Sequence, residues 1–206
     1  MMDPLAADSF ISFGSRLYWL LLLSLLFCRS MDILSTRIAT PNLVLEGNPI
    51  AKLLGWRFLL PINFGFCVAL AAWPLPAIML GTMSLLVAAR NFQSAWLMRS
   101  MGEEAYRAWH IQRIQETRVT LYLFCLAGES GLIAVLGAVI ILFADTVVLL
   151  GIGWGTAGYA SAVAFYILLA RWRLRRASIR RARRSALDNA ALVSAALREN
   201  PQPEGK

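Results

Sequence analysis

The sequence predicts an all-α membrane protein: a polytopic bundle of five transmembrane helices, with a short interfacial helix and a basic tail. Of the 206 residues, 58% are hydrophobic and only 16% are charged, whereas ordinary soluble domains carry about 25% charged residues. A water-soluble chain of this size could not cover so much apolar surface, so lipid is its expected solvent. The apolar runs that we expect to span are residues 17–36, 56–72, 75–98, 119–143 and 146–170.

The first two runs differ in how clearly they predict a span. The first has 20 residues, which is about 30 Å as a helix and matches the hydrocarbon core. Tyr18 and Trp19 are expected at one membrane interface and Arg37 at the other. The second run has 17 residues and contains Pro61 and Asn63, so it is the weakest span. If the second and third runs formed only a re-entrant hairpin, the N-terminus and the C-terminal tail would still lie on the same sides of the membrane as with five full spans.

The connection between the first two runs carries signals for helix ends. Thr40-Pro41 and Asn48-Pro49 are each typical of an N-cap followed by proline at the first helical position. Gly55 suits a helix stop. We therefore expect short helices in this connection.

Two further segments separate the later runs. Residues 103–116 mix aromatic and aliphatic side chains with charges, which predicts a helix that lies in the membrane interface. A very short turn at Asp145 and Thr146 is expected between the fourth and fifth runs.

The basic residues predict the sidedness. If the N-terminus is outside, the connections 37–57 and 99–118 and the tail 171–206 are cytoplasmic and hold 17 of the 20 Lys and Arg residues. The opposite orientation would place all 17 outside, against the positive-inside bias. We expect N-out/C-in, with residues 1–170 as the transmembrane bundle. Many Arg and almost no Lys indicate a GC-rich bacterial genome, and hence the bacterial inner (cytoplasmic) membrane.

Ionisable residues inside the spans form the candidate functional site. Counted inward from the cytoplasmic ends at about 1.5 Å per residue, they fall in one slab of the inner leaflet. Each is costly at that depth unless it pairs, so Arg90 is expected to pair with Asp32 or with Glu129. Arg29 lies three residues before Asp32, on the same helix face. The predicted polar cluster is Arg29, Asp32, Ser35, Thr36, Arg90, Asn91 and Glu129.

Three hypotheses about activity follow from this cluster. The first is a non-enzymatic protein that acts by helix-mediated interaction or assembly around it. The second is a small-solute or ion permease with a path past Asp32, Arg90 and Glu129. The third is an enzyme acting on lipid head groups, with Asp32 or Glu46 as general base, although no nucleophile, metal set or cofactor motif accompanies them. A purely structural network that fixes helix packing is the alternative to all three.

The end of the first run and the loop after it resemble a family of small, uncharacterised bacterial multi-pass membrane proteins. Its pattern is D-x-x-S-T at the end of one span and E-x-N-P before the next. This chain has Asp32, Ser35 and Thr36, and then Glu46, Asn48 and Pro49. The resemblance covers roughly residues 17–98 and implies a domain of unknown function, with no reaction, cofactor or substrate. Capping by Asn48 and neutralisation of Arg37 or Lys52 by Glu46 would also explain the second motif.

The remaining features concern partners. Gly151 and Gly155 form a G-x-x-x-G in the fifth run; packing against the fourth run is the first expectation and self-association the alternative. Cys28, Cys67 and Cys125 lie in apolar runs and are expected to be buried small side chains without metal or disulfide. The tail should bind anionic lipids rather than nucleic acid. Its lipid-surface residues are Arg171, Arg173, Arg175, Arg176, Arg180, Arg181, Arg183 and Arg184.

Overall fold

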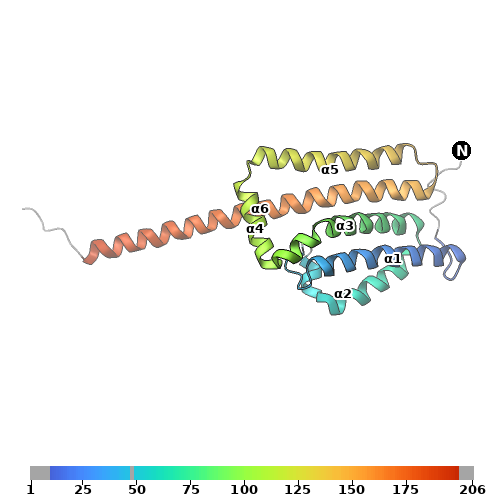
Figure 1. Cartoon of the computed structure of the whole chain (residues 1–206), viewed down its shortest axis with the longest axis horizontal. Coiled ribbons are helices and arrows are strands. Elements are labelled where there is room, and N and C mark those ends of the chain that lie inside the picture. Colours follow the sequence, from blue (N-terminus) through green and yellow to red (C-terminus); the bar gives the residue numbers. More distant parts are fainter. Residues whose placement is uncertain (1–9, 47–48, 200–206) are drawn as a thin grey trace, which may run out of the picture. The chain divides into compact units, whose positions relative to one another are not determined.

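The computed structural model describes residues 10–46 and 49–199, without the side chains of 49–51, 177–179 and 181–199. The described residues form six helices and no strand (Figure 1). Five helices are long and apolar enough to cross a membrane, which is consistent with an integral, multi-pass membrane protein. The chain divides into two compact units, residues 1–164 and 165–206. The helices are α1 (Arg16–Ala39), α2 (Pro49–Leu70), α3 (Pro74–Met101), α4 (Glu103–Glu116), α5 (Val119–Leu142) and α6 (Val147–Glu199).

Helices α1 and α3 pack together through complementary faces. The buried positions of α3 carry small residues at intervals of three or four, among them Ala77, Gly81, Ser84 and Ala88. A Cβ atom at Gly81 would lie 3.5 Å from Cys28 Sγ of α1. Small side chains let the two backbones approach closely, which replaces hydrophobic driving force by van der Waals contact inside a membrane.

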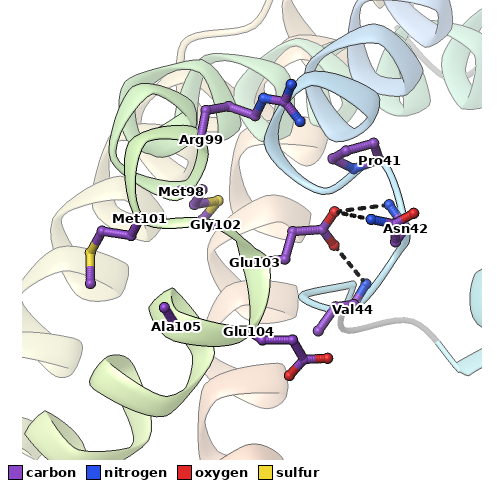
Figure 2. Close-up of a pocket in the computed structure, with 10 residues that line it drawn as sticks. All are labelled: Pro41, Asn42, Val44, Met98, Arg99, Met101, Gly102, Glu103, Glu104 and Ala105. Atoms are coloured by element: carbon purple, nitrogen blue, oxygen red, sulfur yellow. Dashed lines mark hydrogen bonds between the residues drawn. The ribbon is translucent and has the colours of Figure 1, made fainter.

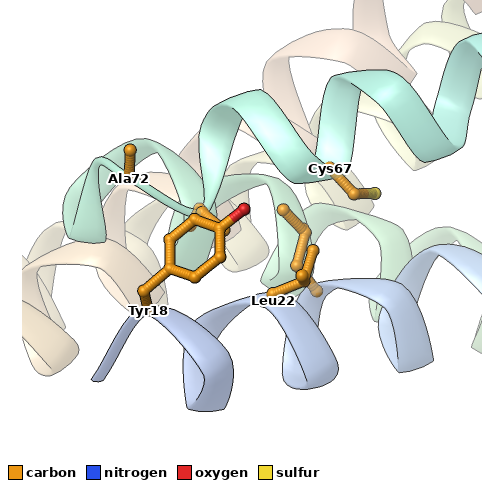
Figure 3. Close-up of a cluster of buried hydrophobic side chains, with 7 residues drawn as sticks. Tyr18, Leu22, Cys67 and Ala72 are labelled. Atoms are coloured by element: carbon orange, nitrogen blue, oxygen red, sulfur yellow. The ribbon is translucent and has the colours of Figure 1, made fainter. Parts of the chain in front are cut away.

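A buried apolar cluster joins the beginning of α1 to the end of α2 (Figure 3). Tyr18 and Leu22 of α1 lie against Cys67 and Ala72. The Tyr18 side chain is only 3% exposed, so it packs inside the protein, and its expected depth at the membrane interface stays a prediction. Its hydroxyl donates to the Val68 carbonyl at 3.1 Å, so the ring can be buried with its polar end satisfied.

Helix α2 begins at Pro49, as the proline signal predicts, while Asn48 lies outside the described residues. The predicted stop at Gly55 is a break in the helix, because its backbone has φ 61° and ψ 178°. Residues with a Cβ atom rarely adopt this conformation, whereas glycine does so without strain. The apolar part of the helix that can span runs Lys52–Leu70.

The short helix expected from Pro41 is wrong. Residues 41–45 form turns and bends, and Leu43 has φ 57°. Thr40 caps the end of α1 rather than the start of a helix, and its hydroxyl accepts from the Leu45 amide at 3.1 Å. The proline signal does not produce a helix here because the loop donates its hydrogen bonds to the Glu103 carboxylate, which lies outside it.

Helix α6 packs on two neighbours through its glycines. Gly153 faces α5, where a Cβ atom would lie 3.0 Å from the Gly137 carbonyl oxygen. Gly151 and Gly155 instead face α3, close to Ile78 and Thr82. The expectation of packing within the chain is therefore confirmed, but the G-x-x-x-G contacts α3 and not the preceding span.

We predict that Gly155→Ala destabilises the protein, because the added Cβ atom would lie 2.7 Å from the Met79 carbonyl oxygen. Overpacking of this kind costs about 1–3 kcal/mol. The measurement is the free energy of unfolding of the purified protein in mixed micelles titrated with sodium dodecyl sulfate.

Gly131→Ala of α5 is the matched control, because a Cβ atom there meets nothing within 4 Å. Its expected effect is a stabilisation of about 0.5–1 kcal/mol, from the better helix propensity of alanine. Equal effects of the two substitutions would show that the α3–α6 contact is not tightly packed.

Candidate functional site

The centre of the site is the guanidinium of Arg29, on the face of α1 that packs inside the chain. Its Nη1 donates to Asp32 Oδ2 at 2.7 Å, three residues further along the helix. The two side chains are 21% and 16% exposed. This confirms that Arg29 and Asp32 share a helix face, and it adds an ion pair between them that the sequence did not assign.

Arg29 also binds residues of α2 and α3. Its Nε donates to Asn63 Oδ1 at 3.1 Å, and its Nη2 donates to the same oxygen. Its Nη1 donates to Ser84 Oγ at 3.1 Å. Asn63 Nδ2 donates to the Leu59 carbonyl at 2.7 Å, which leaves its oxygen turned toward Arg29. One side chain thus ties α1, α2 and α3 together, and we call these four residues, Arg29, Asp32, Asn63 and Ser84, the Arg29 network.

Sequence reasoning missed Asn63 and Ser84 as members of this network. Asn63 counted only as a weakness of the second span, and Ser84 is a small residue among many in α3. One available signal was that an amide inside a span costs free energy unless it is hydrogen-bonded, so Asn63 needs a partner as an ionised group does.

A second set of polar groups lies one turn further along α1. Ser35 Oγ is fully buried and donates to the Asp32 carbonyl at 2.8 Å. Asn91 Nδ2 of α3 donates to Ser35 Oγ at 3.3 Å and to Thr36 Oγ1 at 3.1 Å. The structure therefore brings Ser35, Thr36 and Asn91 together, as the predicted cluster requires.

The other two ionisable residues of the predicted cluster form a separate pair. Arg90 Nη1 of α3 lies 2.9 Å from Glu129 Oε1 of α5. The side chains are 38% and 48% exposed, so this pair is much more accessible than Arg29 and Asp32. The four charges form two pairs with different surroundings, and of the two partners expected for Arg90 the structure has Glu129.

A further site, which the sequence did not predict, lies where α3 meets α4. Glu103, the first residue of α4, accepts hydrogen bonds from Thr40 Oγ1 at 2.7 Å and from the Asn42 and Val44 amides at 3.0 and 3.2 Å. Asn42 Nδ2 also donates to it at 3.0 Å. One carboxylate therefore holds the loop between α1 and α2. The signal was an acidic residue in the first turn of a helix, a pattern too common to single out Glu103.

Beside Glu103 lies an open hollow of about 640 Å³ (Figure 2). Its walls come from the end of α3, the start of α4 and the loop between α1 and α2. We call it the Glu103 hollow. Gly102, with φ 82°, makes the sharp turn between the two helices that form its walls.

The hydrogen bonds to Glu103 stabilise its ionised form. Partial burial raises the pKa of this carboxyl, but the bonds from Thr40, Asn42 and Val44 together outweigh burial and lower the net pKa below its ordinary value. Glu103 is therefore ionised at neutral pH, with its charge directed at the loop.

The motif loop and the tail are described only in part. Glu46 is half-buried, and its amide donates to the Leu43 carbonyl at 3.4 Å. Asn48 and the side chain of Pro49 lie outside the described residues, so their capping role stays a prediction. In the tail, the Arg176 guanidinium lies 3.8 Å from the centre of the Trp172 ring. The side chains of Arg171, Arg173, Arg175 and Arg180 are also described, and those of Arg181, Arg183 and Arg184 are not.

The cysteines do not all behave as expected. Cys67 is buried and Cys28 is half-buried, but Cys125 is exposed on α5. The expectation of burial is wrong there, because a thiol is apolar enough to face hydrocarbon. Within the described residues no three His, Cys, Asp or Glu side chains are grouped as metal ligands.

Comparison with known proteins adds no relative. No family model, no curated protein and no solved structure matches the chain. The resemblance to the family with the D-x-x-S-T and E-x-N-P motifs therefore stays a prediction. The class that the fold defines is a multi-pass membrane protein with five apolar helices.

We predict that the hold of Glu103 on the loop is lost in acid. Since the folded-state pKa is lowered, its stabilisation is present above the ordinary value of 4.5 and disappears as the pH falls through the lowered value. Glu103→Gln should therefore lower the unfolding temperature at pH 7, and the difference from wild type should shrink below pH 4.5.

The control for this pH series is Glu104→Gln in lipid-free detergent, since the neighbouring carboxyl makes none of these bonds. It should follow wild type at every pH. A Glu103→Gln difference that persists unchanged at low pH would contradict an ionised Glu103 as the anchor of the loop.

Proposed function

We propose that the chain is a non-enzymatic protein of the bacterial inner membrane that acts by helix-mediated interaction or assembly around its buried polar groups. The observation that supports this is the Arg29 network. Arg29 makes hydrogen bonds through Nε, Nη1 and Nη2 to side chains of three helices. Its charge and its donors are used inside the chain, which suits a fixed packing centre better than a site that must exchange a solute.

The proposal includes the N-out/C-in orientation. It is supported by the distribution of basic residues, with 17 of 20 in the segments 37–57, 99–118 and 171–206. The tail arginines would then lie against the anionic inner leaflet. Alkaline phosphatase fused after residue 206 should be inactive and a fluorescent protein at the same place bright; the reverse pattern excludes this orientation.

The Arg90–Glu129 pair supports a partner in the membrane. In hydrocarbon a half-exposed ion pair is costly unless another polar surface covers it. A helix of a second copy, or of another membrane protein, would cover the pair. Helix-mediated assembly would thereby bury the Arg90 and Glu129 side chains, which are half-exposed in the single chain.

We predict that Asp32→Asn lowers the free energy of unfolding by about 1–3 kcal/mol, because Arg29 loses its only charged partner in the network. Glu116→Gln is the matched control: Arg113 and Glu116 have the same spacing of three residues at 3.0 Å, but their side chains are 61% and 48% exposed. Exposed pairs contribute about 0–1 kcal/mol. Equal losses in the two variants would exclude the Arg29 network as the packing centre.

The alternative function is a small-solute or ion permease, and the same accessible pair favours it. Water in place of a partner helix would also solvate Arg90 and Glu129. In that case Glu129→Gln should abolish pH- or gradient-dependent uptake into proteoliposomes, with the unfolding temperature unchanged. Under the assembly proposal the wild-type protein shows no uptake across a broad solute panel, and Glu129→Gln reduces recovery of the complex.

A further inference from the structure

The Glu103 hollow lies at the level where a span leaves the hydrocarbon. Helix α3 has 28 residues and is about 42 Å long, which exceeds a hydrocarbon core of about 30 Å. Arg99 stands in its last turn, where basic residues mark the interface. The hollow therefore opens at the depth of lipid head groups, whichever leaflet this is.

The wall of the hollow is held in place without using all of its charges. Glu103 is occupied by its hydrogen bonds to the loop. Trp56 Nε1 donates to the Pro41 carbonyl at 2.7 Å, and Lys52 Nζ donates to the Val44 carbonyl at 3.2 Å, so the loop is fixed from α2 as well. A wall held from two sides is a pre-organised surface, which lowers the entropic cost of binding.

Two charges of opposite sign remain in the lining. Arg99 and Glu104 both line the hollow and are both exposed. Neither side chain forms a hydrogen bond or ion pair with another described residue. Figure 2 shows the Arg99 guanidinium at one edge and the Glu104 carboxylate at the other, with Glu103 between them and turned toward Asn42. Besides Glu103, the lining thus presents one cation and one anion, at opposite edges of the hollow.

The rest of the lining is apolar or weakly polar. Met98 and Val44 contribute thioether and aliphatic surface. Flexible methionine side chains adapt to irregular apolar ligands. This surface suits the glycerol and upper acyl region of a lipid rather than a fully hydrated ion.

We propose that the Glu103 hollow binds the head group of a zwitterionic phospholipid of the phosphoethanolamine type. The phosphate lies on the Arg99 guanidinium, whose planar donors match two phosphate oxygens. The ammonium lies on Glu104. A purely anionic head group has no ammonium to place on Glu104, and only Arg99 would offset the carboxylates of Glu103 and Glu104, so the hollow favours a zwitterionic head group. The proposal stands independently of the assembly function.

The test measures the binding of phosphatidylethanolamine to the full chain in detergent by native mass spectrometry. We expect Arg99→Gln and Glu104→Gln each to weaken binding about tenfold, the effect of losing one charge-assisted contact. Arg107→Gln is the control, because Arg107 is an exposed arginine of α4 that does not line the hollow. It should bind like wild type.

A second lipid separates this site from the tail, which attracts anionic lipids by itself. Phosphatidylglycerol binding should not weaken in Glu104→Gln, whereas phosphatidylethanolamine binding should. Soluble phosphoethanolamine that binds wild type while the lipid does not would overturn a lipid source. Unchanged phosphatidylethanolamine binding in both Arg99→Gln and Glu104→Gln, or equal weakening in Arg107→Gln, would overturn the site.

Discussion

In hydrocarbon a guanidinium must find its acceptors within the protein, and for Arg29 they come from three helices. Asp32 supplies the charge, Asn63 of α2 accepts from two nitrogens and Ser84 of α3 accepts a fourth hydrogen bond. These bonds are directional, so they fix the rotation of each helix as well as its distance. The small-residue face of α3 is what allows the approach, because larger side chains would keep Ser84 out of reach.

The same constraint, applied to Arg90 and Glu129, has a different outcome. Their bond of 2.9 Å neutralises both charges, yet the side chains are 38% and 48% exposed, against 21% and 16% for Arg29 and Asp32. The two ion pairs therefore differ in how far they are buried. The Arg29 and Asp32 pair lies between helices α1, α2 and α3, whereas the Arg90 and Glu129 pair is half-exposed.

Much of this could be predicted from the sequence, for physical reasons that also set the limit. Apolar length gives the spans, and the spacing of three places Arg29 and Asp32 on one face, in step with Tyr18, Leu22 and Leu25. Which charge pairs with which depends on helix rotation, and no local pattern encodes that. The 41–45 loop shows how a distant residue can override a local pattern. Thr40-Pro41 is a typical local signal for a helix, but the carboxylate of Glu103, 63 residues away from Thr40, accepts the hydrogen bonds of the loop instead.

The break at Gly55 restricts the chemistry of its position in an unusual way. No neighbour crowds it, since a Cβ atom there would meet nothing within 4 Å, yet its φ of 61° with ψ of 178° is nearly closed to other amino acids. A substitution would favour regular helical dihedral angles at residue 55. The direction of the helix after it would then change, and with it the orientation of Asn63. Backbone conformation alone therefore favours glycine at this position, and the orientation of the Asn63 amide, eight residues further on, depends on that glycine.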